Sequence, residues 1–328
     1  MAILGAIGLD LDTTVLNLFD AGSAGTITAG AGRNGGAGLS QSNQQAFKVL
    51  AATQATLNIA CGLNFTPNSN TLGNIVGPAF YDAGTVQVNL RIALDGTIAV
   101  YRGNTTLLGS SAIGAYTNGI YNHIEVSATI HPTAGAVQVW VNGASVINLT
   151  SVNTRNTANS FVTQMAVTGP AFASSCITCD IVYGTTRIND CRVECRMPTG
   201  TGTNAAFTPS TAVANWTTVD ETPPNTTDYN ETATVNAIDS FAHAALAGSP
   251  TSISAVIVNV RAQNTTTGAG SIAPFLRSST TDSPGTAVAL NTSYQDIQSV
   301  YETDPATGSA WANAAAVNAA EIGYKKTV

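Results

Sequence analysis

The chain has 328 residues, which is enough for one large β-domain or two ordinary ones. Only 9% of the residues are charged and 44% are hydrophobic, while Thr, Asn, Ser and 30 glycines fill much of the rest, a composition typical of short strands joined by many turns. The net charge of −7 argues against a nucleic-acid partner. No apolar run approaches the roughly 20 residues of a membrane helix, so we expect no membrane partner either.

Residues 22–38 are so rich in Gly, Ala and Ser that they cannot form a core alone, although residues 26–28 are compatible with a short strand. Residues 47–65 predict further strands.

The clearest periodicity lies between residues 84 and 149, where apolar and polar residues alternate as in half-buried strands. Asp95-Gly96 and Asn142-Gly143 are strong hairpin dipeptides within this stretch. We therefore predict an antiparallel meander. Its first strand places on one face Val86, Val88, Leu90 and Ile92, and on the other Gln87, Asn89 and Arg91.

Residues 161–167 and 179–183 predict closing strands, and a linker-like composition follows at residues 197–204. We divide the chain into a first domain over residues 1–186, a linker over 187–204 and a C-terminal β domain over 205–328. Strands are expected in that second domain at 252–261, 271–276, 287–289 and 320–324. The predicted fold class is all-β, with an antiparallel sandwich followed by a smaller sandwich-like domain.

Three segments carry a resemblance to a known fold family. Residues 88–103, 121–131 and 135–143 look like the laminin-G/concanavalin-A-like jelly roll, and residues 27–39 resemble its opening segment. The resemblance implies a jelly roll over the first domain. That fold serves lectins, glucanases, adhesins and capsid proteins, so it does not specify a function.

A second set of motifs resembles the C-terminal part of tailed-bacteriophage structural proteins that carry such a jelly roll. The matching segments are 190–194, 197–200, 219–224, 301–308 and 317–323, with Trp216 and Trp311. This resemblance implies a virion component and no catalytic residues. From it we expect a non-enzymatic structural protein on the exterior of the phage particle, in a neck collar or tail sleeve, or otherwise as head decoration, that associates with itself and with other phage structural proteins.

Two other functions stay open. The first alternative is a glycan-binding tail fibre or adhesin that recognises host-surface glycans, for which Trp140, Tyr101 and Tyr121 are the candidate contact aromatics. The second is a glycoside hydrolase, which needs two carboxylates roughly 5 to 9.5 Å apart. Glu125 has no second acid two or four residues away, so we interpret it as a solvent-facing strand residue.

The histidines do not form a recognisable site. His123 and His131 lie on one strand eight residues apart, about 26 Å at about 3.3 Å per residue, so they cannot share a metal ion. His243 has no Ser or Cys partner that the sequence identifies. We expect surface histidines or histidines with satisfied hydrogen bonds.

The cysteines are the most informative chemical feature of the sequence. Cys176, Cys179, Cys191 and Cys195 form a C-x2-C-x11-C-x3-C cluster, with Cys61 far away along the chain. We favour disulfides over free thiols, and free thiols over zinc, because the second pair lacks the usual zinc-knuckle spacing. An odd count leaves one thiol unpaired, so we hypothesise a bridge between neighbouring subunits.

Calcium is the one cofactor that we consider, since lectin-like jelly rolls bind it through clustered oxygen ligands. Asp10 and Asp12 are the only close Asp pair, and Asp180 and Asp190 flank the cysteine cluster. None of them matches a calcium-binding loop, so we expect no cofactor.

Overall fold

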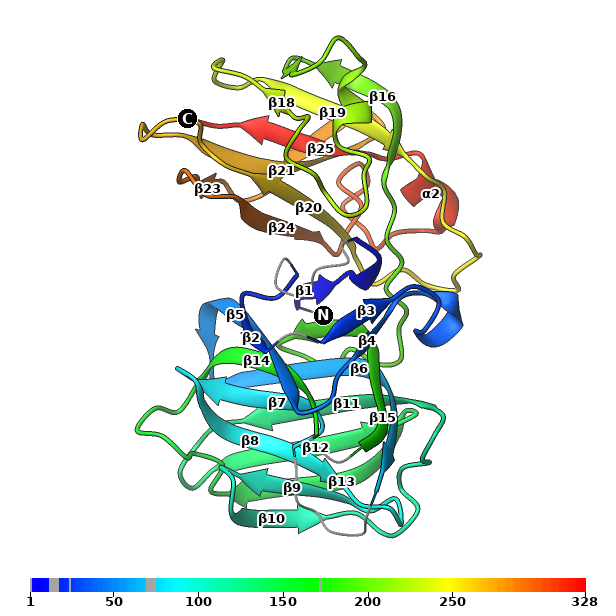
Figure 1. Cartoon of the computed structure of the whole chain (residues 1–328), viewed down its shortest axis with the longest axis vertical. Helices are drawn as coiled ribbons and strands as arrows, with labels where there is room; N and C mark the ends of the chain where they lie inside the picture. Colours follow the sequence, from blue (N-terminus) through cyan, green and yellow to red (C-terminus); the bar gives the residue numbers. More distant parts are fainter. Residues whose placement is uncertain (1, 12–17, 24, 69–74, 171–172) are drawn as a thin grey trace. The chain divides into compact units, whose positions relative to one another are not determined.

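The computed structural model describes the whole chain except residues 1, 12–17, 24, 69–74 and 171–172. It consists of two compact units, Met1–Val193 and Glu194–Val328 (Figure 1). Antiparallel sheets dominate both units, so the all-β prediction is confirmed. No helix in the described ranges is long and apolar enough to span a membrane.

The first unit contains two large sheets, counted over its described residues. The eight-stranded sheet consists, in pairing order, of β13 (Ala144–Val152), β12 (Gly135–Val141), β11 (Tyr121–Thr129), β6 (Thr56–Pro67), β15 (Ala173–Gly184), β4 (Gly38–Ser40) and β3 (Thr26–Thr28), with β1 (Ile3–Ile7) also paired to β15. The seven-stranded sheet consists of β10 (Thr106–Ser110), β9 (Ile98–Arg102), β8 (Thr85–Ile92), β7 (Gly77–Asp82), β14 (Val162–Gly169), β5 (Gln44–Gln54) and β2 (Ala21–Ser23). Two 3-10 turns, η1 (Leu9–Leu11) and η2 (Arg33–Gly35), precede β4.

The two sheets enclose one continuous apolar core. It takes alternate side chains from both sheets, for example Leu57, Ile59 and Leu63 from β6 and Val88 and Leu90 from β8, all of them inaccessible to solvent. This is the packing expected of a β-sandwich, in which every second residue of a strand points inward.

The predicted meander over residues 84–149 is divided between the two sheets. Strands β8 and β9 pair in one sheet, whereas β11, β12 and β13 pair in the other. Both predicted hairpin turns are present, and Asn142 and Gly143 have φ angles of 48° and 82°, as a type I′ turn requires. The prediction that Val86 shares a face with Val88, Leu90 and Ile92 is wrong. The register between β7 and β8 shifts beside Val86, so its side chain packs with Ala79 on the outer face of the sheet.

The outermost strands of the sandwich are irregular. The register between β9 and β10 shifts at Leu107/Gly109, and β12 and β13 shift twice, at Gly135/Ala136 and at Val139/Trp140. Each shift is a bulge or similar irregularity that interrupts the regular hydrogen-bond ladder at the edge of a sheet.

The second unit has its own sheets and core. Among its described residues a six-stranded sheet contains β16 (Pro198–Ala205), β19 (Ile238–His243), β25 (Glu321–Lys326), β21 (Ser271–Ser278), β22 (Thr281–Pro284) and β23 (Val288–Ala289). Two smaller sheets pair β20 (Val256–Ala262) with β24 (Gln295–Tyr301) and β17 (Thr208–Pro209) with β18 (Asn230–Glu231). The short helices are η3 (Asn215–Thr218) and α2 (Ala314–Asn318).

A buried carboxylate anchors the start of this second unit. Asp239 is inaccessible to solvent and accepts hydrogen bonds from the backbone N–H of Ala206 at 2.7 Å and of Phe207 at 2.9 Å, and from the amide of Asn215 at 2.6 Å. Three donors satisfy the charge, which makes its burial tolerable.

The segment 187–204 differs from the predicted linker. Residues 187–193 belong to the first unit, and β16 occupies 198–205 as a strand of the second unit. The residues of β16, rich in Thr and Gly, alternate between half-buried and exposed positions, as in a strand with one covered face. A composition rich in Thr and Gly is therefore not sufficient evidence of a linker.

A buried hydroxyl offers a test of the core of the first unit. The Tyr116 hydroxyl accepts a hydrogen bond from the backbone N–H of Phe65 at 2.8 Å and donates one to the carbonyl of Leu63 at 3.0 Å, with the residue 2% exposed. Tyr116→Phe leaves that N–H unpaired, so we expect a loss of about 1–3 kcal/mol in the free energy of unfolding, measured by chemical denaturation. The exposed Tyr294, changed to Phe, is the control and should cost less than about 0.5 kcal/mol; equal effects would contradict the assignment.

Candidate functional site

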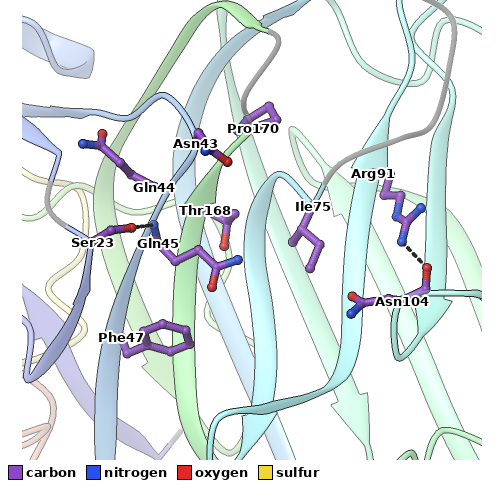
Figure 2. A pocket seen from close by; sticks show the side chains of 11 residues that line it. Ser23, Asn43, Gln44, Gln45, Phe47, Ile75, Arg91, Asn104, Thr168 and Pro170 are labelled. Carbon is purple, nitrogen blue, oxygen red and sulfur yellow. Dashed lines mark hydrogen bonds between the residues drawn. The ribbon is translucent and has the colours of Figure 1, made fainter.

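An open groove of about 500 Å³ lies on the outer face of the seven-stranded sheet (Figure 2). Strands β5, β14 and β8 and the turns beside them supply most of its walls. The lining residues are Ser23, Asn43, Gln44, Gln45, Phe47, Ile75, Arg91, Asn104, Thr168, Gly169 and Pro170.

The hollow arises from the sizes of side chains that pair across the sheet. Ala166 of β14 is paired with Phe47 of β5 on one side and with Ala79 of β7 on the other. Ala79 is in turn paired with Asn89 of β8. At this level of the sheet the two central strands present only the methyl groups of Ala166 and Ala79, while the flanking strands carry larger side chains. Phe47 and Ile75 pack against these alanines and remain half-exposed, forming an apolar surface within the groove.

Hydrogen bonds and ring contacts orient the wall formed by β5. The Tyr81 hydroxyl lies 3.5 Å from Oε1 of Gln45, and its ring meets the ring of Phe47 edge-on with centroids 4.8 Å apart. Burial raises the pKa of Tyr81 to about 12, so the phenol keeps its proton and donates to the amide oxygen of Gln45. The Nε2 end of the Gln45 side-chain amide therefore remains on the side of the groove.

The outward side chains of β8 position the other wall. Nη2 of Arg91 donates to the carbonyl of Asn104 at 2.5 Å, and the guanidinium lies 4.0 Å from the centroid of the Tyr101 ring. Nδ2 of Asn89 donates to the carbonyl of Gly103 at 2.6 Å. These bonds fix the turn after β9, so the side chain of Asn104 projects from a supported backbone (Figure 2).

Gln87, the third outward residue of β8, holds the loop of residues 153–161. Its Oε1 accepts from the backbone N–H of Asn156 at 2.6 Å and of Thr157 at 3.2 Å, and its Nε2 donates to Thr157 Oγ1 at 2.8 Å and to the carbonyl of Asn159 at 3.0 Å. Gln87 is completely buried. The alternation predicted for β8 holds from Gln87 onward, and the start of its polar face is covered by this loop instead of water.

The groove offers a particular combination of chemical groups. Side-chain amides of Asn43, Gln44, Gln45 and Asn104 each carry both donors and acceptors, and Phe47 supplies an apolar surface between them. The described lining residues include no carboxylate, so the groove does not provide the paired acids that glycoside hydrolysis uses. Its side chains can bind a polar ligand that also has an apolar face.

The three aromatics predicted as glycan contacts do not lie together. Tyr101 lies on the groove sheet under Arg91, whereas Trp140 and Tyr121 belong to the eight-stranded sheet. The guanidinium of Arg187 covers Trp140 at 4.6 Å from the ring centroid, and the hydroxyl of Tyr121 donates to the carbonyl of Ala31. Sequence reasoning missed Phe47 and Gln45, although outward alternation over Gln45, Phe47 and Val49 was a usable signal.

The interpretation of Glu125 as a solvent-facing residue is wrong. Its side chain is only 1% exposed, because residues 185–193, here called the cover segment, lie over it. Its carboxylate accepts hydrogen bonds from the backbone N–H of Ile188 at 2.6 Å and of Asn189 at 3.1 Å, and lies 3.5 Å from Nε of Arg187. Glu125 thus fixes the cover segment to β11.

Arg33 attaches the same cover segment to β15. Its Nε lies 3.1 Å from Asp180, its Nη1 lies 2.7 Å from Asp190, and its Nη2 donates to the carbonyl of Cys191 at 2.5 Å. Asp180 also accepts from the backbone N–H of Val193 at 2.9 Å. Two of the four Asp residues considered for calcium therefore neutralise an arginine.

His131, His243 and Asp10 have ordinary hydrogen-bond partners. Nδ1 of His131 accepts from the backbone N–H of Ala134 at 2.8 Å, and the two ring nitrogens of His243 lie 2.9 and 3.1 Å from backbone carbonyls. Asp10 accepts from the backbone N–H of Ala37 at 2.8 Å, while Asp12 lies outside the described residues. Over the described ranges, no three His, Cys, Asp or Glu side chains are grouped so that they could hold a metal ion.

All five cysteines are free thiols in the structure. Cys61, Cys176 and Cys179 are buried, and Cys191 and Cys195 are half-buried. Burial raises the pKa of Cys176, Cys179 and Cys191 to about 12, and that of Cys61 well above its usual value. Cross-linking between subunits stays a prediction.

Comparison with known proteins gave structural neighbours only. No protein-family model and no curated protein matches the chain. An alginate lyase solved in complex with an alginate trisaccharide is 13% identical, covers 57% of this chain and 99% of its own, and gives a TM-score of 0.39. A sialidase of Trypanosoma rangeli (12%, covering 50% and 27%, TM-score 0.35) and botulinum neurotoxin type C, whose cell entry depends on two ganglioside molecules (8%, covering 52% and 43%, TM-score 0.35), are also similar.

These neighbours correct the functional prediction made from the sequence. They are two glycan-processing enzymes and a ganglioside-dependent toxin, and none of them is a phage virion protein, so the predicted non-enzymatic virion structural role is withdrawn. The likeness itself is remote and concerns the sandwich fold alone. A function for this chain must therefore be argued from its own groove.

The buried amide of Gln87 provides a test of how the groove face is built. Gln87→Ala removes the acceptor for two backbone N–H groups, so we expect a loss of about 2–4 kcal/mol in the free energy of unfolding. Hydrogen exchange should show the largest loss of protection in residues 156–161. Gln138→Ala, which removes one exposed bond to Asn148, is the matched control with little effect; similar losses in both variants would show that the loop does not depend on Gln87.

The thiols provide a second test. At pH 8 we expect native Cys61, Cys176, Cys179 and Cys191 to react with iodoacetamide at least about a hundredfold more slowly than in the unfolded chain, because burial and a raised pKa suppress the thiolate. Mass spectrometry would identify the labelled sites. Unfolding without reductant should make all five thiols react; a smaller number would reveal a disulfide.

Proposed function

We propose that the first unit binds a carbohydrate chain in the groove of the seven-stranded sheet. The observation that carries the proposal is the partly exposed ring of Phe47 in an open hollow that amide side chains also line. A sugar ring has an apolar face of C–H groups and a rim of hydroxyls. Phe47 matches the face, and the amides of Gln45 and Asn104, which both donate and accept, match the rim.

The arrangement of the walls supports a ligand longer than one sugar. Gln44, Gln45 and Phe47 lie on one side of the groove and Asn104 on the other, with Ile75 between (Figure 2). Partly buried bonds hold the side chain of Gln45 and the backbone of Asn104, which lowers the conformational entropy that binding costs. The open side allows a polymer to enter along its length.

Affinity electrophoresis tests this proposal. The wild-type chain, run through native gels that contain xylan, dextran, polygalacturonate or alginate, should be retarded by at least one of them. We expect Phe47→Ala and Asn104→Ala each to weaken that interaction by about tenfold or more, equivalent to about 1.4 kcal/mol. Asn104→Ala keeps the backbone carbonyl that accepts from Arg91, so the wall should persist.

Val49→Ala is the control for the aromatic variant. Val49 shares the outward face of β5, is 48% exposed and lies outside the lining of the groove, so its loss should leave retardation unchanged. Asn259, an exposed residue of β20 in the second unit, serves as the control for the amide variant. Absence of retardation in every gel, or equal retardation of groove and control variants, would contradict the proposal. The same incubations, analysed for released oligosaccharides, would show whether the bound chain is cleaved.

A further inference from the structure

The imidazole ring of His123 is buried and, within the part of the chain that the structure describes, makes no hydrogen bond. It lies on β11, is 2% exposed, and both ring nitrogens lack a partner within the described residues. Buried polar side chains are nearly always hydrogen-bonded, so such a ring needs an explanation. None of the sites discussed above uses it.

The cover segment and η2 enclose this ring against the outer face of the eight-stranded sheet. On β6 the residue opposite His123 is Gly62, and Arg33 and Cys179 lie over that glycine, at 3.5 and 2.7 Å from where a Cβ would stand. The charged groups that act on the ring are Arg33 of η2 and Arg187 and Asp190 of the cover segment. Ion pairs connect these three groups to Asp180 of β15 and to Glu125 of β11.

These carboxylates are engaged by other groups, and among the described residues neither ring nitrogen of His123 has an acceptor within hydrogen-bond distance. Asp180 and Asp190 pair with Arg33, and Glu125 binds the backbone of the cover segment and Arg187. An imidazolium in this position would be a buried cation with two unpaired N–H donors. The folded arrangement therefore requires the neutral ring.

We propose that His123 makes the cover segment an acid-sensitive latch, closed over a neutral ring and opened when the ring takes a proton. The cover segment leads directly into the second unit along the chain, since that unit begins at Glu194. Opening it frees the last nine residues before that boundary from β11 and β15. The inference does not depend on glycan binding.

The direction of the pH effect follows from the two states of the ring. Burial, partly offset by Asp190, lowers the pKa of His123 from about 6.5 to about 4 in the closed form. The open form exposes the ring and restores the ordinary value. Stability of the closed form is therefore full above pH 6.5 and is lost as the pH falls toward 4. Between pH 7 and pH 5 the opening equilibrium should increase about 20-fold, while carboxylates with ordinary values near 4 stay mostly ionised.

Amide hydrogen exchange measures this opening. The backbone N–H groups of Ile188, Asn189 and Val193 donate to Glu125 and Asp180, so their protection reports closure directly. In the wild-type chain their protection factors should fall about 20-fold from pH 7 to pH 5, with core amides such as Val126 unaffected. His123→Asn should remove the pH dependence, and His131→Asn, two residues beyond the end of β11, should retain it.

NMR titration of the His123 ring in the wild-type chain keeps the test decisive if His123→Asn does not fold. A ring that stays neutral at pH 5 in the closed form supports the latch. A ring that titrates near pH 6.5 while Ile188 and Asn189 keep their protection overturns it. An equal loss of protection at Val126 and at the cover segment would also overturn it, since the effect would then be global unfolding.

Discussion

Buried polar side chains on the outward faces of the two sheets determine what each face of the first unit presents. Gln87 holds a loop on the seven-stranded sheet, and Glu125 holds the cover segment on the eight-stranded sheet. In both cases a completely buried side chain satisfies two backbone N–H groups of a segment that has no strand partner. A segment covers the sheet where a buried side chain binds its backbone. The groove stays open where the sheet presents the small side chains of Ala166 and Ala79.

The sequence was sufficient for the strands and insufficient for what lies over them. Alternation located β8, β11 and β12, because half-buried strands repeat every two residues, and Asn142-Gly143 marked a hairpin by its dihedral preference alone. The division of those strands between two sheets depends on long-range pairing, which periodicity does not encode. Glu125 was misassigned for the same reason, since its cover comes from residues more than sixty positions later.

The groove shows a similar limit. Phe47 and Gln45 alternate outward on β5, but the hollow beside them exists only because Ala166 and Ala79 stand opposite on neighbouring strands. No local pattern joins these residues. Strand alternation and the resemblance to a laminin-G/concanavalin-A-like jelly roll gave the fold class correctly, whereas the function inferred from the resemblance to phage structural proteins was wrong, as expected where one fold serves many functions.

The irregular outer strands have a consequence for how copies of the chain meet one another. Only 9% of the residues are charged, so charge repulsion gives little protection against pairing between exposed strand edges. The register shifts in β10 and between β12 and β13 twist or interrupt the rows of N–H and C=O groups that an incoming strand would need. Backbone geometry therefore takes over the protection against edge-to-edge aggregation that lysines provide on more highly charged sandwiches.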